Sequence, residues 1–311
     1  MSRWLSGRTR ARFKLASIVL VFLYLAICVV LFFYQRQLIY RSNDYLSNTP
    51  AGDRFGRSYY ENVWIPAGGR DRIHGWWLPA PKPDELYRVL EGEPAAVVNP
   101  QQVVLLFRGV GNNMGDTNYV YRATSLRQLG FSVLIFDYRG WGWSSGGLPY
   151  EERLYEDGEI VWNYLRDVRG VSAENVAIYG ASLGGAIALN VAVNHPEASA
   201  LILQSTFTTM ADAIKSKPIA GLFPIDWLLT ERFDSLAKVQ QLQMPVLFIH
   251  GSRDSVVPPA MSKQLYDATP TSKQLFYVED ADHVAIWQPG VRSYLRAVYR
   301  FVYAVTGDSR I

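Results

Sequence analysis

The distribution of apolar residues divides the chain into two parts with different patterns. Residues 15–34 (LASIVLVFLYLAICVVLFFY) form a run without a charged residue. As an α-helix this run would rise about 30 Å, the thickness of one hydrocarbon core. After residue 102 the apolar residues instead form short runs that alternate with amphipathic stretches. That alternation is typical of buried parallel strands and their crossover helices.

Basic residues flank the long apolar run unequally. More of them precede the run than follow it closely: Arg3, Arg8, Arg10, Arg12 and Lys14 before it, Arg36 and Arg41 after it. Because cytoplasmic flanks carry the excess of Lys and Arg, we expect a single-pass signal anchor with a cytoplasmic N-terminus. The remaining chain would lie across the membrane, in the periplasm if the source is bacterial. A cleaved signal peptide is the alternative, but its apolar region is usually shorter and ends at small residues, whereas this run ends in LFFY.

The second part of the chain has the alternation of an α/β protein. After an expected hairpin at 59–79, the runs interpreted as strands lie at 103–107, 131–137, 175–180, 200–205, 245–251 and 273–279. The stretches interpreted as helices lie at 116–129, 150–166, 184–194, 259–266 and 290–305. We therefore predict a mostly parallel central sheet with helices on both faces.

Residues 206–243 interrupt this alternation with an apolar segment that contains Pro218 and Pro224. We interpret the segment as a small helical lid over the carboxyl ends of the strands, where α/β proteins bind ligands. Phe223 and Trp227 are then candidate substrate contacts in an acyl-chain groove. The alternative is that the apolar side chains of this segment pack on the sheet or dip into the bilayer interface.

The composition of the chain argues against several classes of function and site. A net charge of +3, dispersed along the chain, does not indicate nucleic-acid binding. Cys28 is the only cysteine, which excludes a disulfide framework and a thiolate metal site. The four histidines do not form the cluster that a zinc site requires. We predict no metal and no cofactor.

A single serine lies between glycines where a predicted strand meets a predicted helix. Gly180, Ser182 and Gly184 match the pattern G-x-S-x-G of a nucleophile elbow. In that turn the serine has a strained backbone, and the glycines let strand and helix approach closely. The motif alone would also fit a tight turn in a Gly-rich chain, but the strand before it and the helix after it are the context that an elbow requires. Ser182 is therefore the candidate nucleophile.

A serine hydroxyl needs a base, and in this type of fold the histidine comes last in the chain. His283 lies in EDADHVAIW, between the last expected strand and the last expected helix. His250, in FIHG at the end of a strand, is the alternative, which we interpret as structural. His283 is therefore the candidate base.

The acid should lie between the serine and the histidine along the chain. Asp254 is in the loop after the strand 245–251 and before a helix, so it is the candidate for orienting the imidazole. The alternatives are Asp137, Asp212, Asp280 and Asp282. Asp280 and Asp282 are too near His283 in sequence to face its ring easily, and Asp137 more simply braces its own turn.

An oxyanion hole needs two backbone N–H groups aimed at the developing charge. Leu183, directly after the candidate nucleophile and at the start of a helix, would supply one. The loop RGVGNN after the strand 103–107 would supply the other through Val110, because Gly109 and Gly111 permit the required backbone geometry.

Five segments in this order, DYRGWGWSSG, YGASLGG, STFTTM, PVLFIHGSRDSVVPP and VEDADHVAIW, resemble the alpha/beta-hydrolase superfamily. More narrowly, they resemble the membrane-anchored serine hydrolases of its alpha/beta-hydrolase-domain subgroup. The resemblance implies an alpha/beta-hydrolase fold and a Ser-His-Asp acyl-enzyme mechanism. Members usually carry His-Gly-Asn where this chain has Arg108, Gly109 and Val110. Arg108 would either favour an anionic substrate or pair with a nearby carboxylate, and we prefer the pairing.

The resulting organisation is a cytoplasmic basic tail (1–14), a transmembrane anchor helix (15–34), a linker (35–58) and an alpha/beta-hydrolase domain (59–305) with the lid insertion (206–243). The leading hypothesis is a serine hydrolase that cleaves ester or thioester bonds of apolar acyl substrates. The alternatives are a serine peptidase on the same fold and a non-enzymatic membrane-tethered scaffold. The expected partners are the membrane and a small-molecule or lipid-like acyl substrate.

Overall fold

A computed structural model describes residues 7–40, 43–50, 59–82, 101–283 and 287–306. Within these residues eight strands form one sheet in the order β1-β2-β4-β3-β5-β6-β7-β8. Their bounds are β1 Glu61–Pro66, β2 Arg72–Leu78, β3 Val103–Phe107, β4 Ser132–Asp137, β5 Val176–Ala181, β6 Ala200–Gln204, β7 Val246–Gly251 and β8 Lys273–Val278. The β1–β2 hairpin is antiparallel and pairs antiparallel with β4, whereas β3 to β8 are parallel. The predicted mostly parallel sheet is confirmed.

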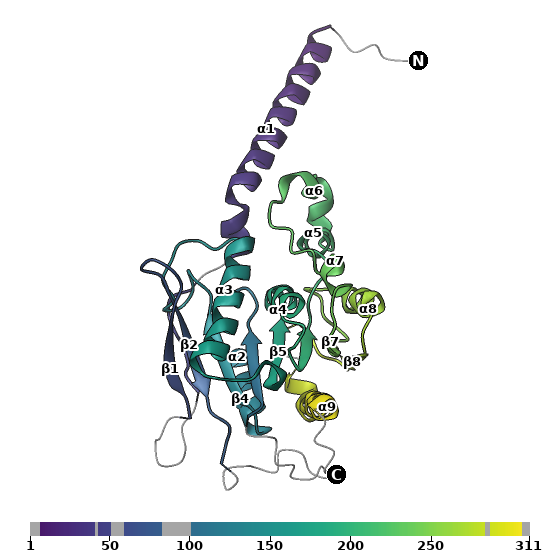
Figure 1. Ribbon diagram of the computed structural model, residues 1–311. Helices are drawn as coiled ribbons and strands as arrows, with labels where there is room; N and C mark the ends of the chain where they lie inside the picture. The colour runs from purple at the N-terminus through teal and green to yellow at the C-terminus, as the bar shows by residue number, and fades with distance from the viewer. Residues whose placement is uncertain (1–6, 41–42, 51–58, 83–100, 284–286, 307–311) are drawn as a thin grey trace.

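Helices cover both faces of this sheet (Figure 1). One face packs against α3 (Glu151–Asn163), α4 (Leu183–Asn194) and α8 (Pro259–Ala268), and the other against α2 (Thr117–Gln128) and α9 (Trp287–Thr306). The side chains of β3 alternate between the two cores and are all buried, as expected for a central strand. Burial on both faces explains why the strand sequences are continuously apolar.

The segment 206–243, here named the cap, lies along the chain between β6 and β7. It forms α5 (Met210–Lys215), a 3₁₀ turn η4 (Pro218–Leu222), α6 (Ile225–Leu228) and α7 (Ser235–Val239). We name residues 218–228 the cap tip. In Figure 1, α5 and α6 rise above the sheet on the side from which α1 projects.

The N-terminal helix α1 (Gly7–Ile39) extends away from the sheet (Figure 1). Its residues 12–39 have the length and composition to cross a membrane, and 6% of their most apolar stretch is buried. The predicted anchor 15–34 lies within this helix, and its exposed apolar surface fits a membrane anchor. Of the predicted tail and linker, residues 1–6, 41–42 and 51–58 are outside the described residues.

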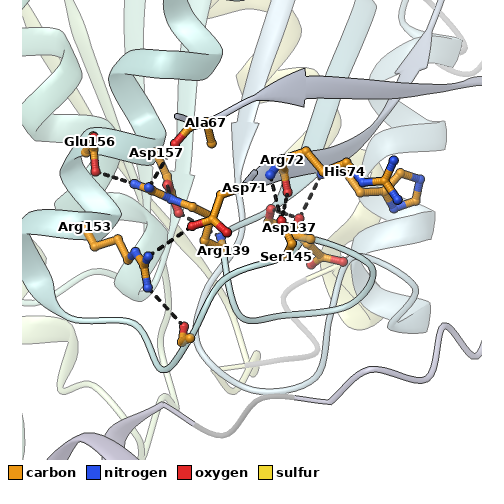
Figure 2. A network of polar contacts seen from close by, with 12 residues as sticks. Ala67, Asp71, Arg72, His74, Asp137, Arg139, Ser145, Arg153, Glu156 and Asp157 are labelled. Atoms are coloured by element: carbon orange, nitrogen blue, oxygen red, sulfur yellow. Dashed lines mark hydrogen bonds and ion pairs between the residues drawn. The ribbon is translucent and has the colours of Figure 1, made fainter. Parts of the chain in front are cut away.

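The loop after β4 is fixed to neighbouring elements by polar contacts (Figure 2). Arg139 donates to Asp157 of α3 through its backbone N–H (2.8 Å) and its Nε (2.5 Å), and it also pairs with Glu156. Its Nη1 donates to the carbonyl of Ala67 beside the β1–β2 turn (3.2 Å). Because Arg139 and Asp157 are both buried, this contact ties the loop, the hairpin and α3 together.

Candidate active site

Ser182 occupies the sharp turn between β5 and α4. Its φ is 53° and its ψ is −122°, a conformation that is strained for a non-glycine residue. A Cβ at Gly180 would lie 2.5 Å from the carbonyl of Gly184, and a Cβ at Gly184 would lie 2.3 Å from the carbonyl of Phe107. Both positions therefore require glycine. The turn has the geometry of a nucleophile elbow, with the glycines where that geometry needs them.

Three hydrogen bonds hold the strained serine backbone. Its N–H donates to the carbonyl of Gln204 (2.8 Å) on β6. Its carbonyl accepts from the N–H of Gly185 (2.9 Å) and from Oγ1 of Thr206 (2.8 Å). These hydrogen bonds come from α4 and from β6 with the residues just after it, so the surrounding structure holds the backbone of Ser182 in its strained conformation.

The structure brings Ser182, His283 and Asp254 into one hydrogen-bonded chain. Nε2 of His283 lies 3.1 Å from Oγ of Ser182, and its Nδ1 lies 2.7 Å from Oδ2 of Asp254. Ser182 follows β5, Asp254 follows β7 and His283 follows β8. These strands are parallel, so their carboxyl ends meet at one edge of the sheet and the three loops converge there. The geometry lets the imidazole accept the serine proton while the carboxylate holds its other nitrogen.

Asp254 is bound from four sides. Its Oδ1 accepts from the N–H groups of Val256 (2.9 Å) and Val257 (2.8 Å), and its Oδ2 also lies 3.1 Å from Nε2 of His250. Burial acts to raise the pKa of Asp254, but the hydrogen bonds from His250 and His283 outweigh it and lower the pKa below its ordinary value. The carboxyl group is therefore ionised at any pH near neutrality, as the orienting role requires.

The loop after β3 passes directly beside the serine. A Cβ at Gly109 would lie 3.1 Å from Cβ of Ser182, and the N–H of Gly109 donates to Oη of Tyr119 (2.9 Å). Val110 follows and lines the same pocket as Ser182. Leu183 is the first residue of α4, and the first N–H groups of a helix have no partner within it. Of the two predicted oxyanion donors, Leu183 therefore directly follows Ser182 in the chain, and Val110 belongs to the loop that passes beside it.

A cavity of about 630 Å³ opens beside Ser182 and His283. It is lined by Asn43, Val110, Gly111, Asn112, Asp116, Asn118, Tyr119, Arg122, Ala181, Ser182, Gln204, Ser205, Val256 and His283. Most of these side chains are polar. The lining includes residues from the start of α2, and Val256 from the loop after β7.

Other sequence-predicted residues lie away from this cavity. Phe223 and Trp227 are not among the residues that line it; Phe223 stacks on Tyr24 of α1 with ring centroids 6.0 Å apart, and the side chain of Trp227 is 88% exposed. Arg108 is buried and pairs with Asp137 (2.5 Å). No group of three or more metal-binding side chains occurs in the described part of the chain.

Sequence reasoning missed two features of the site. The first is the bond from His250 to Asp254, because a histidine at a strand end gives no sign of where its ring points. The second is Arg122, a buried cation in the wall of the cavity, 5.4 Å from the ring of Tyr119 and 6.0 Å from that of Tyr179. The sequence could have indicated Arg122 as an arginine at a position of the predicted helix 116–129 that faces the core.

Known proteins share this sequence pattern and architecture. The family model described as "Serine aminopeptidase, S33" matches residues 98–237 and 234–288. The uncharacterized protein Rv2307c of Mycobacterium tuberculosis is 34% identical over 55% of this chain and 60% of its own length. The lysophosphatidylserine lipase ABHD12 of zebrafish (Danio rerio) is 31% identical over 56% of this chain and 48% of its own length. The chain therefore spans about half to three fifths of the length of these curated relatives.

Among solved structures, the esterase Pf2001 of Pyrococcus furiosus superposes with a TM-score of 0.62 at 20% identity. The superposition covers 80% of this chain and 91% of that chain. At this level of identity the likeness concerns the fold.

Proposed function

Because the chain belongs to the serine aminopeptidase S33 family of alpha/beta hydrolases, we propose that it is a membrane-anchored serine hydrolase that cleaves ester or thioester bonds of acyl substrates. The observation that carries this proposal is the chain of hydrogen bonds from Ser182 through His283 to Asp254, at the edge of a cavity large enough for a small ligand.

The proposed reaction has two steps. In the first, Oγ of Ser182 attacks the acyl carbonyl while Nε2 of His283 takes its proton, and Asp254 stabilises the imidazolium that forms. The N–H groups of Leu183 and Val110 bind the oxyanion, and His283 then protonates the departing alcohol or thiol. In the second, His283 takes a proton from water, which attacks the acyl-enzyme. His283 then returns the proton to Oγ of Ser182 as the bond between Oγ and the acyl carbon breaks and the acid is released.

The cavity suits an ester that has both apolar and polar parts. Its lining combines apolar surface, to which Val110, Ala181 and Val256 contribute, with hydrogen-bonding side chains, so an acyl ester of a polar alcohol fits beside the serine. The zebrafish relative is named for a lysophospholipid, which is an ester of this kind. This likeness supports the substrate class.

A peptidase is the second candidate, because the family model is described as an aminopeptidase. An aminopeptidase has to bind a free α-ammonium group, which an unengaged carboxylate would do. Asp116 lines the cavity, but its oxygens already accept from the backbone and side-chain N–H groups of Asn118 and from the side chain of Asn112, each at 2.9 Å. This engagement favours the ester.

Active-site labelling tests the proposal. A fluorophosphonate probe should label the wild-type protein and should fail to label Ser182→Ala. Ser205→Ala is the matched control, because Ser205 lines the same cavity and, like Ser182, directly follows a buried strand segment and has a positive φ (48°). It should label as the wild type does. A panel of p-nitrophenyl esters and aminoacyl p-nitroanilides then separates esterase from peptidase, and labelling of Ser182→Ala would contradict the nucleophile assignment.

The proposed topology has the N-terminus in the cytoplasm and the hydrolase domain on the other side. It rests on the charge bias around the apolar helix. A reporter fused after Ile311 should be active only outside the cytoplasm, and the full-length chain should resist carbonate extraction. A reporter active in the cytoplasm would reverse the orientation.

A further inference from the structure

The cap tip lies against the C-terminal half of the apolar helix α1. Oη of Tyr24 donates to the carbonyl of Leu222 (3.1 Å), and Tyr24 stacks on Phe223. Further along α1, Nε2 of Gln35 donates to the carbonyl of Leu228 (3.1 Å), and its Oε1 accepts from the N–H of Thr230 (2.7 Å). The two segments therefore run side by side (Figure 1).

The contact with Tyr24 gives the depth of Leu222 and Phe223, whereas Leu228, bound to Gln35, lies at the end of the apolar run. Tyr24 lies midway along the apolar run 15–34, and the ten residues from Tyr24 to Tyr34 rise about 15 Å, half of a hydrocarbon core of about 30 Å. Placing the cap tip in water would require the membrane boundary to lie before Tyr24. Then the exposed side chains of Val29, Val30 and Phe33 would also be in water, and the part of the apolar run left in the bilayer would be too short to span it.

The exposed side chains of the cap tip are apolar except for that of Asp226. Ile219, Leu222 and Trp227 are 69%, 66% and 88% exposed. The carboxylate on the same short helix as Trp227, Asp226, is paired with Lys215 (2.5 Å), so neither charge is left uncompensated. Contiguous exposed apolar side chains mark an interaction surface, and aromatic residues are enriched where proteins meet lipid.

We propose that the cap tip is inserted in the bilayer beside α1, so that lipid substrates reach the active site from the membrane. The occupant of its exposed apolar surface is the hydrocarbon region that already surrounds α1, because the two surfaces are continuous and lie at the same depth. The part of this proposal that concerns substrates rests on the hydrolase function proposed above.

The base of the cap adjoins the catalytic cavity. Nζ of Lys217, directly before the cap tip, donates to the carbonyls of Ser255 (2.5 Å) and Val256 (2.7 Å). Val256 is 47% exposed and forms the rim of the cavity that holds Ser182. An acyl ester that leaves the bilayer along the cap tip therefore meets this rim next.

Depth measurements test insertion without any reference to activity. The full-length protein with Cys28→Ala receives one new cysteine, either Ile219→Cys or Trp227→Cys. This cysteine is labelled with fluorescent NBD, and the protein is placed in vesicles of phosphatidylcholine and phosphatidylglycerol. Val168→Cys is the control, because Val168 is 69% exposed and follows the end of α3 that is remote from α1. Nitroxide lipids should quench the cap-tip labels about threefold more strongly than the control label. Equal quenching at all three positions, with equal access to aqueous iodide, would overturn the proposal.

Activity measurements test the route of the substrate. Ile219→Asp should lower the hydrolysis of a long-chain p-nitrophenyl ester embedded in the same vesicles by about tenfold, because a carboxylate in hydrocarbon is costly. It should leave the hydrolysis of water-soluble p-nitrophenyl acetate within twofold, and Val168→Asp should change neither rate. An unchanged rate on the embedded ester would overturn the route. Absence of Ser182-dependent hydrolysis in the wild type would instead refute the proposed function, while the depth measurement still decides insertion.

Discussion

Replacing Asp254 with Asn should preserve the fold and disable the base. Oδ1 of Asp254 accepts two backbone N–H groups, from Val256 and Val257, and Oδ2 faces Nδ1 of His283 (2.7 Å) and Nε2 of His250 (3.1 Å). An amide keeps one oxygen. Because both backbone donors require an acceptor at the Oδ1 position, the NH₂ group of the Asp254→Asn variant takes the Oδ2 position and points at the two histidines.

This exchange reverses the hydrogen bond to the imidazole. The amide donates to Nδ1 of His283, so the ring proton moves to Nε2, the nitrogen 3.1 Å from Oγ of Ser182. A protonated Nε2 is unable to take the serine proton. The same replacement in a serine protease lowers kcat by about 10⁴-fold, which corresponds to about 5.5 kcal/mol of lost transition-state stabilisation. We expect a loss of that size here, and a larger one, about 10⁶-fold, for Ser182→Ala.

Steady-state hydrolysis of a p-nitrophenyl ester by the full-length protein measures this loss, with the melting temperature as the check that the variant is folded. Asp280→Asn is the matched control, because Asp280 is an exposed aspartate that pairs with Arg253 (2.7 Å) near the same site. Its rate should stay within twofold of the wild type. A folded Asp254→Asn protein that lost less than tenfold, or a comparable loss in Asp280→Asn, would refute the assignment of the acid.

Two further predictions concern stability. Gly184→Ala places a methyl group 2.3 Å from the carbonyl of Phe107 and should lower the free energy of unfolding by about 3 kcal/mol, seen as a lower melting temperature, whereas Gly221→Ala, with no atom within 4 Å, should change it little. Burial and the neighbouring Arg72 lower the pKa of His74 to about 4. Since an unfolded histidine has a pKa of about 6.5, the folded state is not penalised above that pH, and about 3 kcal/mol of stability is lost as the pH falls towards 4. Chemical denaturation at several pH values should show that slope, and a slope unchanged in His74→Gln would contradict it.

The fold could be predicted because its central strands are buried on both faces and are therefore apolar throughout. The end of a helix could not be predicted where an α-helix continues as another type of helix. The sequence predicts a helix over 150–166, but the α-helix ends at Asn163 and the chain continues as a π-helical turn, Tyr164–Val168. Both segments carry the same apolar periodicity, and the change in hydrogen bonding leaves no mark in the pattern of residues.

The candidate site could be predicted to the extent that chain order determines position. Ser182, Asp254 and His283 each follow a parallel strand, so topology alone brings their loops to one edge of the sheet. The environment of Trp227 could not be predicted in this way. An apolar side chain in a cap is equally compatible with a substrate groove, a protein core and a membrane. Only the position of the cap along α1 favours one of these environments over the others.

Arg108 departs from the family motif and makes polar contacts within the loop beside Ser182. Its Nε binds Asp137, and its Nη1 donates to the carbonyl of Gly109 (3.0 Å). In a trans peptide the carbonyl of one residue and the N–H of the next point in opposite directions. Anchoring the Gly109 carbonyl towards the buried Arg108 therefore turns the N–H of Val110 away from it, on a loop that lines the cavity with Ser182. The guanidinium thus fixes the orientation of the peptide that we propose as the second oxyanion donor, from behind the loop and without contact with the substrate.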